Sequence, residues 1–124
     1  MTVYSVSDDG RAWTPFVETE PRGWLFWRLK GLDGVTWYLP AYGFEHGRAA
    51  LLSSTDGVQW SQVSLIHEGD RSDEPDIQFL PDGRMLATLR LEISDSWLGH
   101  PEGSTLITSA HHRTRFGRWA IGAR

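Results

Sequence analysis

Two Asp-Gly turns of the same form constrain the fold of this chain more than any other feature. Residues 7–13 (SDDGRAW) and 54–60 (STDGVQW) carry Ser, Asp, Gly and Trp at the same offsets. An Asp-Gly pair between apolar strands predicts a hairpin, because Gly accepts the positive φ that the turn needs. Further Asp-Gly pairs at Asp33 and Asp82 alternate with these turns. A period of about fifty residues that carries four short strands is typical of a β-propeller blade.

The spacing of the turns divides the chain into half a unit and two whole units. Residues 1–20 hold two expected strands, and residues 21–68 and 69–124 hold four each. We therefore expect an all-β chain of about two and a half four-stranded propeller blades. No segment has a sustained apolar period of about 3.6 residues, so we expect little helix. Either the chain is a fragment of a propeller, or other chains complete the ring.

Apolar and aromatic residues predict which parts of these strands are buried. The segment 24–30 is mostly apolar, and we expect a strand that is buried on both faces. Trp13 and Trp60 recur at the two turns, and Trp119 follows the last expected turn. A Trp that recurs with the repeat is expected to pack in the core, because its ring buries a large area.

Bulk properties exclude several classes of function. The net charge is -4 and the chain has no run of Lys or Arg, so we expect no nucleic-acid partner. No apolar run approaches the roughly 20 residues of a membrane span, so we expect no membrane partner. Cysteine is absent, which excludes disulfides and thiolate metal sites. Met1 leads directly into an expected strand without a visible signal peptide, so the default location is cytoplasmic. We expect no cofactor.

The turns of the form Ser-x-Asp-Gly-x-x-Trp resemble the Asp boxes of the sialidase-like (BNR-repeat) β-propellers. In that family the box joins the third and fourth strands of a blade. The copies here are one residue shorter between Asp and Trp than the common Ser-x-Asp-x-Gly-x-Thr-Trp form, and they lack its Thr. The box occurs in enzymes and in non-enzymes, so the resemblance implies a fold and not an activity.

A second resemblance concerns the segment from Glu74 to Arg90. It is similar to the sialidase segment that begins with an active-site Glu and ends with a substrate-binding Arg. The turn at Asp82 lies midway, so Glu74 and Arg90 should come near each other at the same end of two adjacent strands. The resemblance implies that Glu74 activates a Tyr nucleophile and that Arg90 clamps a substrate carboxylate. The structural alternative is an ion pair that braces the hairpin.

Four further residues are candidate carbohydrate contacts: Arg28, Tyr42, Glu92 and Trp97. Arg28 is the nearest match to the family's first clamp Arg, with a salt bridge between blades as the alternative. Glu92 lies two residues beyond Arg90 and therefore on the same face of the strand. Tyr42 ends an expected strand where propeller pockets open, with a surface loop as the alternative, and Trp97 lies in a polar loop where it could stack on a sugar.

We expect no metal site, because His111 and His112 have no further ligand at suitable spacing. The sequence offers no counterpart of the family's Tyr nucleophile, third Arg or acid Asp. The resemblance therefore implies a relative of glycoside hydrolases that is inactive as an isolated chain. The alternative is a non-catalytic propeller that binds carbohydrate or protein. Self-assembly is a further prediction, since a homo-oligomer of two chains would supply five blades.

Overall fold

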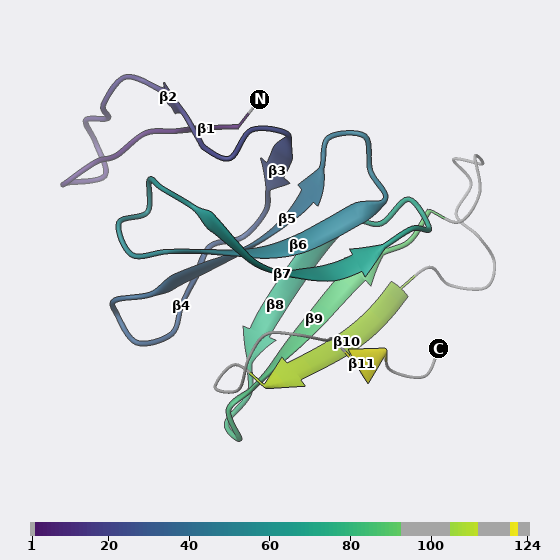
Figure 1. Ribbon diagram of the computed structural model, residues 1–124. Coiled ribbons are helices and arrows are strands. Elements are labelled where there is room, and N and C mark those ends of the chain that lie inside the picture. Colours follow the sequence, from purple (N-terminus) through teal and green to yellow (C-terminus); the bar gives the residue numbers. More distant parts are fainter. Residues whose placement is uncertain (1, 93–104, 112–119, 122–124) are drawn as a thin grey trace.

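The computed structural model describes residues 2–92, 105–111 and 120–121, and this part of the chain is all-β (Figure 1). The strands are β1 (Val3–Tyr4), β2 (Val17–Glu18), β3 (Trp24–Phe26), β4 (Lys30–Gly31), β5 (Trp37–Gly43), β6 (Arg48–Ser54), β7 (Ser61–Glu68), β8 (Asp73–Phe79), β9 (Arg84–Arg90), β10 (Thr105–His111) and β11 (Ala120–Ile121). The expected absence of helix is confirmed for the described residues. No helix in this part of the chain is long and apolar enough to cross a membrane.

The strands form three antiparallel sheets, in which each strand pairs mostly with its neighbours along the chain. The strands β1 and β2 make a two-stranded ribbon. The second sheet has the order β3-β5-β6-β7, with β4 also paired to β5. The third sheet has the order β11-β10-β9-β8. The two larger sheets thus draw their strands from residues 24–68 and 73–121.

Side-chain oxygens of Ser and Asp accept backbone N–H groups within the Asp-Gly turns. Asp56 Oδ1 accepts the backbone N–H groups of Val58 and Gln59, both at 2.8 Å, and Ser54 Oγ accepts that of Gly57 at 2.8 Å. Gly57 has a φ of 75°, a left-handed conformation that costs glycine little. The same bonds recur in the first turn, where Asp9 Oδ1 accepts the N–H groups of residues 11 and 12 at 2.8 and 3.0 Å. The repeat is therefore a repeat of turn geometry.

The sheet β5-β6-β7 is buried on both faces at β5 and β6, whereas β7 is only partly buried. One cluster of buried side chains joins it to β8 and β9: Tyr38, Ala49, Leu51, Ile66, Ile77, Met85, Ala87, Leu89 and Leu91. The second cluster contains Leu39, Ala41, Ala50, Leu52 and Trp60, against which Trp24 and Phe26 pack. Neighbouring residues of β6, such as Leu51 and Leu52, enter different clusters because successive side chains of a strand point to opposite faces. Figure 1 shows this sheet lying across β8 and β9.

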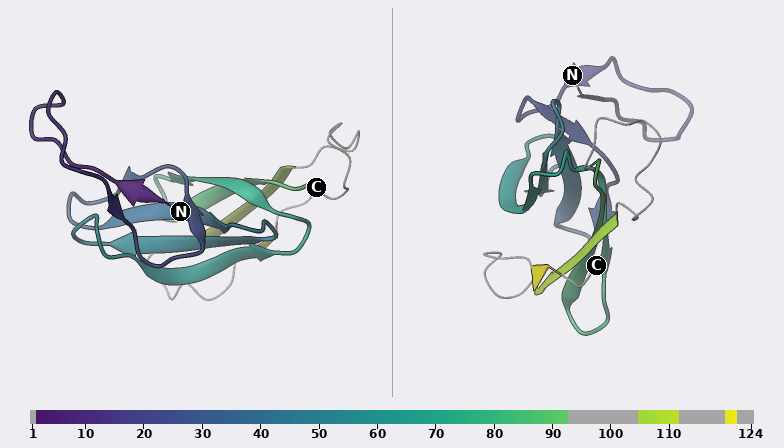
Figure 2. Two further views of the ribbon diagram at one scale, coloured as in Figure 1. Left: turned by 90° about the horizontal axis from the view of Figure 1, so that it is seen from above. Right: turned by 90° about the vertical axis from the view of Figure 1, so that its right-hand side faces the viewer.

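The ribbon β1–β2 projects from the rest of the protein, as Figure 2 shows in its left view. Only two residue pairs make its ladder, so the strands expected over residues 2–7 and 13–17 form only in part. Trp13 is 63% exposed, and Phe16 is 78% exposed. The prediction that Trp13 packs in the core is wrong, because the ribbon has no second layer over it. The prediction for Trp60 is confirmed, since only 8% of this residue is exposed.

The expected strand over residues 24–30 is interrupted and is not buried on both faces. It forms β3 and β4, and three residues (27–29) between them lie opposite two residues (39–40) of β5. Pro40 has no N–H to donate, which favours an irregularity at this point of the ladder. Arg28 lies within the irregular segment, and its side chain is 67% exposed. The break thus turns an arginine that was expected on an apolar strand toward the surface.

Candidate functional site

Glu74 and Arg90 meet at one end of the β8–β9 hairpin, as predicted. Arg90 Nη1 lies 3.2 Å from Glu74 Oε2. The register, however, pairs Arg90 with Asp73, and it shifts between Asp73 and Asp76. Glu74 lies in this irregular part of β8 with a φ of 42°, which is an uncommon conformation for a residue with a side chain. The two residues therefore approach each other beside a local distortion of the ladder.

Asp73 is the principal partner of Arg90. Arg90 donates from Nε to Asp73 Oδ1 at 3.0 Å and from Nη2 to Asp73 Oδ2 at 2.7 Å. Paired bonds of this kind match the planar guanidinium to the carboxylate. The Asp73 side chain is 1% exposed and that of Arg90 is 46% exposed. The hydrogen bonds to Asp73 are the main cause that raises the pKa of Arg90 above its usual range.

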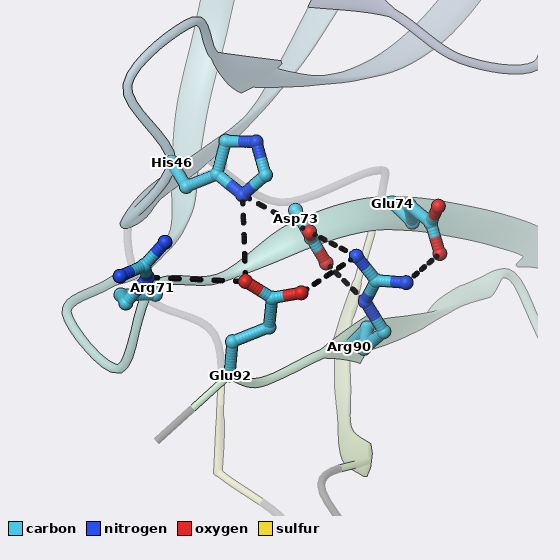
Figure 3. Close-up of polar contacts among 6 residues, drawn as sticks. All are labelled: His46, Arg71, Asp73, Glu74, Arg90 and Glu92. Atoms are coloured by element: carbon cyan, nitrogen blue, oxygen red, sulfur yellow. Dashed lines mark hydrogen bonds and ion pairs between the residues drawn. The ribbon is translucent and has the colours of Figure 1, made fainter. Parts of the chain in front are cut away.

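Glu92 is the third carboxylate at the same guanidinium. Arg90 Nη2 donates to Glu92 Oε1 at 2.9 Å. The two side chains therefore lie on the same side, as expected from their spacing of two residues. Glu92 Oε2 lies 3.8 Å from Arg71 Nε. Every guanidinium nitrogen of Arg90 is therefore within 3.2 Å of a carboxylate oxygen of the chain. We call these six residues the charged cluster (Figure 3): His46, Arg71, Asp73, Glu74, Arg90 and Glu92.

His46 closes the charged cluster from the turn between β5 and β6. Its Nδ1 atom lies 3.1 Å from Asp73 Oδ2 and 3.9 Å from Glu92 Oε2. This nitrogen is buried and makes no hydrogen bond. The two atoms are therefore close enough for an ion pair at 3.1 Å, but they are not aligned for a hydrogen bond. A φ of 62° at His46 aims the side chain inward. Left-handed residues with side chains are most often retained where function or neighbouring contacts require them.

Donor atoms of His46, Asp73 and Glu92 lie within 4.8 Å of one another, a separation that could hold a metal ion. The same carboxylates are already neutralised by guanidinium groups. Arg90 Nη2 is 2.7 Å from Asp73 Oδ2, and Arg71 Nε is 3.8 Å from Glu92 Oε2. Both arginines already contact carboxylate oxygens that a divalent cation would need as ligands. The arrangement therefore favours an ion-pair network.

An aromatic edge continues from the charged cluster. The Tyr42 ring lies 5.4 Å from the His46 ring and 6.1 Å from the Trp27 ring, both in edge-on contacts. Burial raises the pKa of Tyr42, and the charges of Asp73 and Glu74 raise it further. Trp27 is 39% exposed, so part of its ring remains open to solvent. Tyr42, a predicted carbohydrate contact, thus lies beside the cluster, while Trp27 was missed because its strand was expected to be buried.

Arg28 reaches the neighbouring sheet but not the charged cluster. Its Nη1 atom lies 3.6 Å from Asp76 Oδ2, and Lys30 Nζ lies 3.4 Å from Asp76 Oδ1. The contact links the segment between β3 and β4 to β8, which is the salt bridge that the sequence left open as the alternative. Trp97, the remaining predicted contact, lies outside the described residues, as do Trp119 and His112.

Sequence reasoning missed Asp73, His46 and Arg71, which it had assigned to loops. One signal was present for Asp73: it directly precedes Glu74, so a register shift of one residue brings it opposite Arg90. His46 carries no such signal, because the turn that holds it is distant in sequence from β8. No family model matches the chain, and no curated protein or solved structure matches it either. The sialidase-like resemblance therefore stays a prediction.

Proposed function

We propose that this chain is a segment of a sialidase-like β-propeller whose charged cluster and aromatic edge bind carbohydrate. The observation that carries the proposal is the convergence of Glu74 and Arg90 beside Tyr42 and Trp27. Carbohydrate sites combine ring faces, which cover apolar C–H surfaces, with a few placed polar groups. The sequential order of antiparallel strands and the burial of β5 and β6 on both faces fit sheets that are stacked radially.

Binding without hydrolysis is the activity that the geometry favours. A sialidase-like reaction needs a Tyr nucleophile that loses its proton readily, and Tyr42 is the tyrosine beside Glu74. Its pKa is raised by burial and by neighbouring carboxylates, so Tyr42 stays protonated and is a poor nucleophile. Arg90 is engaged by three carboxylates and does not present an open fork to a substrate. We therefore expect no glycosidase activity from this chain.

The test measures the binding of neutral and charged methyl glycosides to the full chain by ligand-observed NMR. Trp27→Ala should weaken binding by about fivefold, since stacking against an aromatic ring contributes roughly 1 kcal/mol. Trp13→Ala is the matched control, because it removes an exposed Trp from the ribbon. Failure of every sugar to bind would refute the proposal. Turnover of a fluorogenic sialoside by the pure protein would refute the non-catalytic part.

A second candidate is self-association through the ribbon. Its apolar side chains are exposed, and Trp13, Pro15 and Phe16 line a surface hollow with Ser5 and Thr14. Exposed apolar surface of this kind marks interaction sites. A mass near twice 14.1 kDa by light scattering, lost in a Trp13→Ser/Phe16→Ser variant, would support a homo-oligomer. A stable monomer of the unaltered chain would rule this candidate out.

A further inference from the structure

We propose that the charged cluster recognises an uncharged sugar or an amino sugar, and not a sugar that carries a carboxylate. The inference rests on the proposed carbohydrate binding and names the class of ligand. It departs from the expectation that Arg90 clamps a substrate carboxylate. Three features carry it: the partners of Arg90, the net charge of the cluster and the aromatic edge.

The first feature is that Arg90 already holds carboxylates of the chain on every nitrogen. Asp73 takes Nε and Nη2, Glu92 takes Nη2, and Glu74 faces Nη1 at 3.2 Å. A carboxylate from a ligand would therefore find no free pair of parallel N–H groups and could reach only Nη1, beside Glu74, unless it displaced one of them. Displacing Asp73 would leave a buried charge without its partner, which is among the costliest changes in a protein interior. Displacing Glu74 or Glu92 would leave that carboxylate without its contact to Arg90 and close to the incoming anion.

The second feature is the balance of charge. The cluster holds three carboxylates, Asp73, Glu74 and Glu92, against the guanidinium groups of Arg71 and Arg90, so its net charge is -1 with His46 neutral. The side chains of Glu74 and Glu92 are both about one third exposed. An ionised carboxylate only accepts hydrogen bonds, so these groups attract hydroxyl and ammonium donors. The same field repels a sugar carboxylate.

The third feature is the aromatic edge, which supplies the contact that a neutral sugar needs. The rings of Trp27, Tyr42 and His46 follow one another toward Asp73, with centroids 6.1 and 5.4 Å apart. Trp27 is the exposed end of this series. A sugar ring that lies against Tyr42, beside Trp27, would have its hydroxyls near Glu74, whose charge acts on Tyr42, and would use both the apolar and the acceptor groups of the site. Such binding requires neither a positive charge on the ligand nor a metal ion.

The experiment uses the methyl glycosides of glucose, glucosamine, glucuronic acid and N-acetylneuraminic acid with the full chain. The first three share one ring and differ mainly in charge. We expect glucoside and glucosaminide to bind, and both acidic sugars to bind at least about tenfold more weakly. Tighter binding of the acidic sugars would overturn this inference and leave the carbohydrate proposal standing. Absence of binding by all four would overturn both.

Charge variants test the cause of the preference. Glu74→Gln/Glu92→Gln keeps the shape of two exposed side chains and changes the net charge of the cluster from -1 to about +1. We expect the preference to shift toward the acidic sugars by about tenfold or more. Glu18→Gln/Glu20→Gln, which removes the same charge in and beside β2, should leave the preference unchanged. An equal shift in both variants would show a general charge effect and overturn the assignment to the cluster.

Discussion

Arg90 and Asp73 face each other across β8 and β9 and are joined by two parallel hydrogen bonds of 3.0 and 2.7 Å. The carboxylate is buried and the guanidinium is half exposed. The pair thus has an inner end that anchors the hairpin and an outer end that carries Glu74 and Glu92. Asp73, which is too buried for a ligand to reach, therefore holds Arg90 in its position at the surface.

Replacing Asp73 should therefore destabilise the protein more than replacing the other carboxylates. Removal of one partner from a buried ion pair costs about 3–5 kcal/mol, but Arg90 is half exposed and water can hydrate it, so we expect about 2 kcal/mol for Asp73→Ala. Glu92→Ala, the control, removes an exposed partner of the same guanidinium and should cost less than about 1 kcal/mol. Urea denaturation measures both. Equal losses would contradict the anchoring role of Asp73.

The position of Glu74 shows how far sequence reasoning reached at this site. The Asp82-Gly83 turn correctly placed residues 74 and 90 near each other, because a tight turn fixes which residues lie at the strand ends. It did not predict the irregularity between Asp73 and Asp76, which gives Asp73 the paired position. Pro75, which has no N–H to donate, lies in this stretch and is a local signal for an irregularity, but it does not fix which residue then faces Arg90. The all-β class was predictable from local turns, whereas the pairing of Arg90 with Asp73 was not.

The Asp residues of the turns predict a dependence of stability on pH. Backbone N–H groups of residues 59 and 58 lower the pKa of Asp56 below 3.8, and similar bonds lower the pKa values of Asp9 and Asp33. A carboxyl with a lower pKa in the folded chain stabilises it above the unfolded pKa. This stabilisation is lost as the pH falls through the folded pKa. We therefore expect the free energy of unfolding to decrease below about pH 4.

An Asp33→Asn/Asp56→Asn variant isolates this effect, because the amide oxygen can still accept the turn hydrogen bonds but does not titrate in this range. Its stability in urea should vary less with pH below about pH 4 than that of the unaltered protein. Glu45→Gln changes an exposed carboxylate outside the Asp-Gly turns. It is the control, and its stability should keep the full dependence on pH. An unchanged slope in the double variant would contradict the role of the turn aspartates.

The two faces of β6 should contribute comparably to stability. Leu51 and Leu52 are both fully buried, and they belong to the clusters on opposite faces of the sheet. Leu→Ala in a packed core costs about 2–5 kcal/mol, and we expect values in this range for each position. Thermal or urea unfolding measures them. A negligible loss at Leu51 would mean that the packing between this sheet and β8–β9 does not form in solution.

Exposure of the segment around Trp27 was not predictable from its apolar composition. The sequence suggested a strand that is buried on both faces, and the ladder instead breaks opposite Pro40. The sequence shows that Pro40 has no N–H, but whether this breaks a ladder depends on which strand pairs with β5 at that position. That pairing is a tertiary property. For this reason the sequence placed Arg28 in the site and left Trp27 out of it.

The two tryptophans of the repeated turn should differ sharply in their effect on stability. Trp60 is buried, packs edge-on against Phe26 with ring centroids 5.8 Å apart, and donates from Nε1 to the carbonyl oxygen of Gly57 at 3.2 Å. Trp60→Ala should therefore cost about 3–5 kcal/mol, as removal of a buried aromatic does. Trp13 has the same sequence context but lies exposed on the ribbon, so Trp13→Ala should change the free energy of unfolding by less than about 0.5 kcal/mol. Urea denaturation of the monomer measures both variants. A large loss for Trp13→Ala would show that its ring is covered in solution, and a mass measurement by light scattering would then reveal whether a second copy covers it.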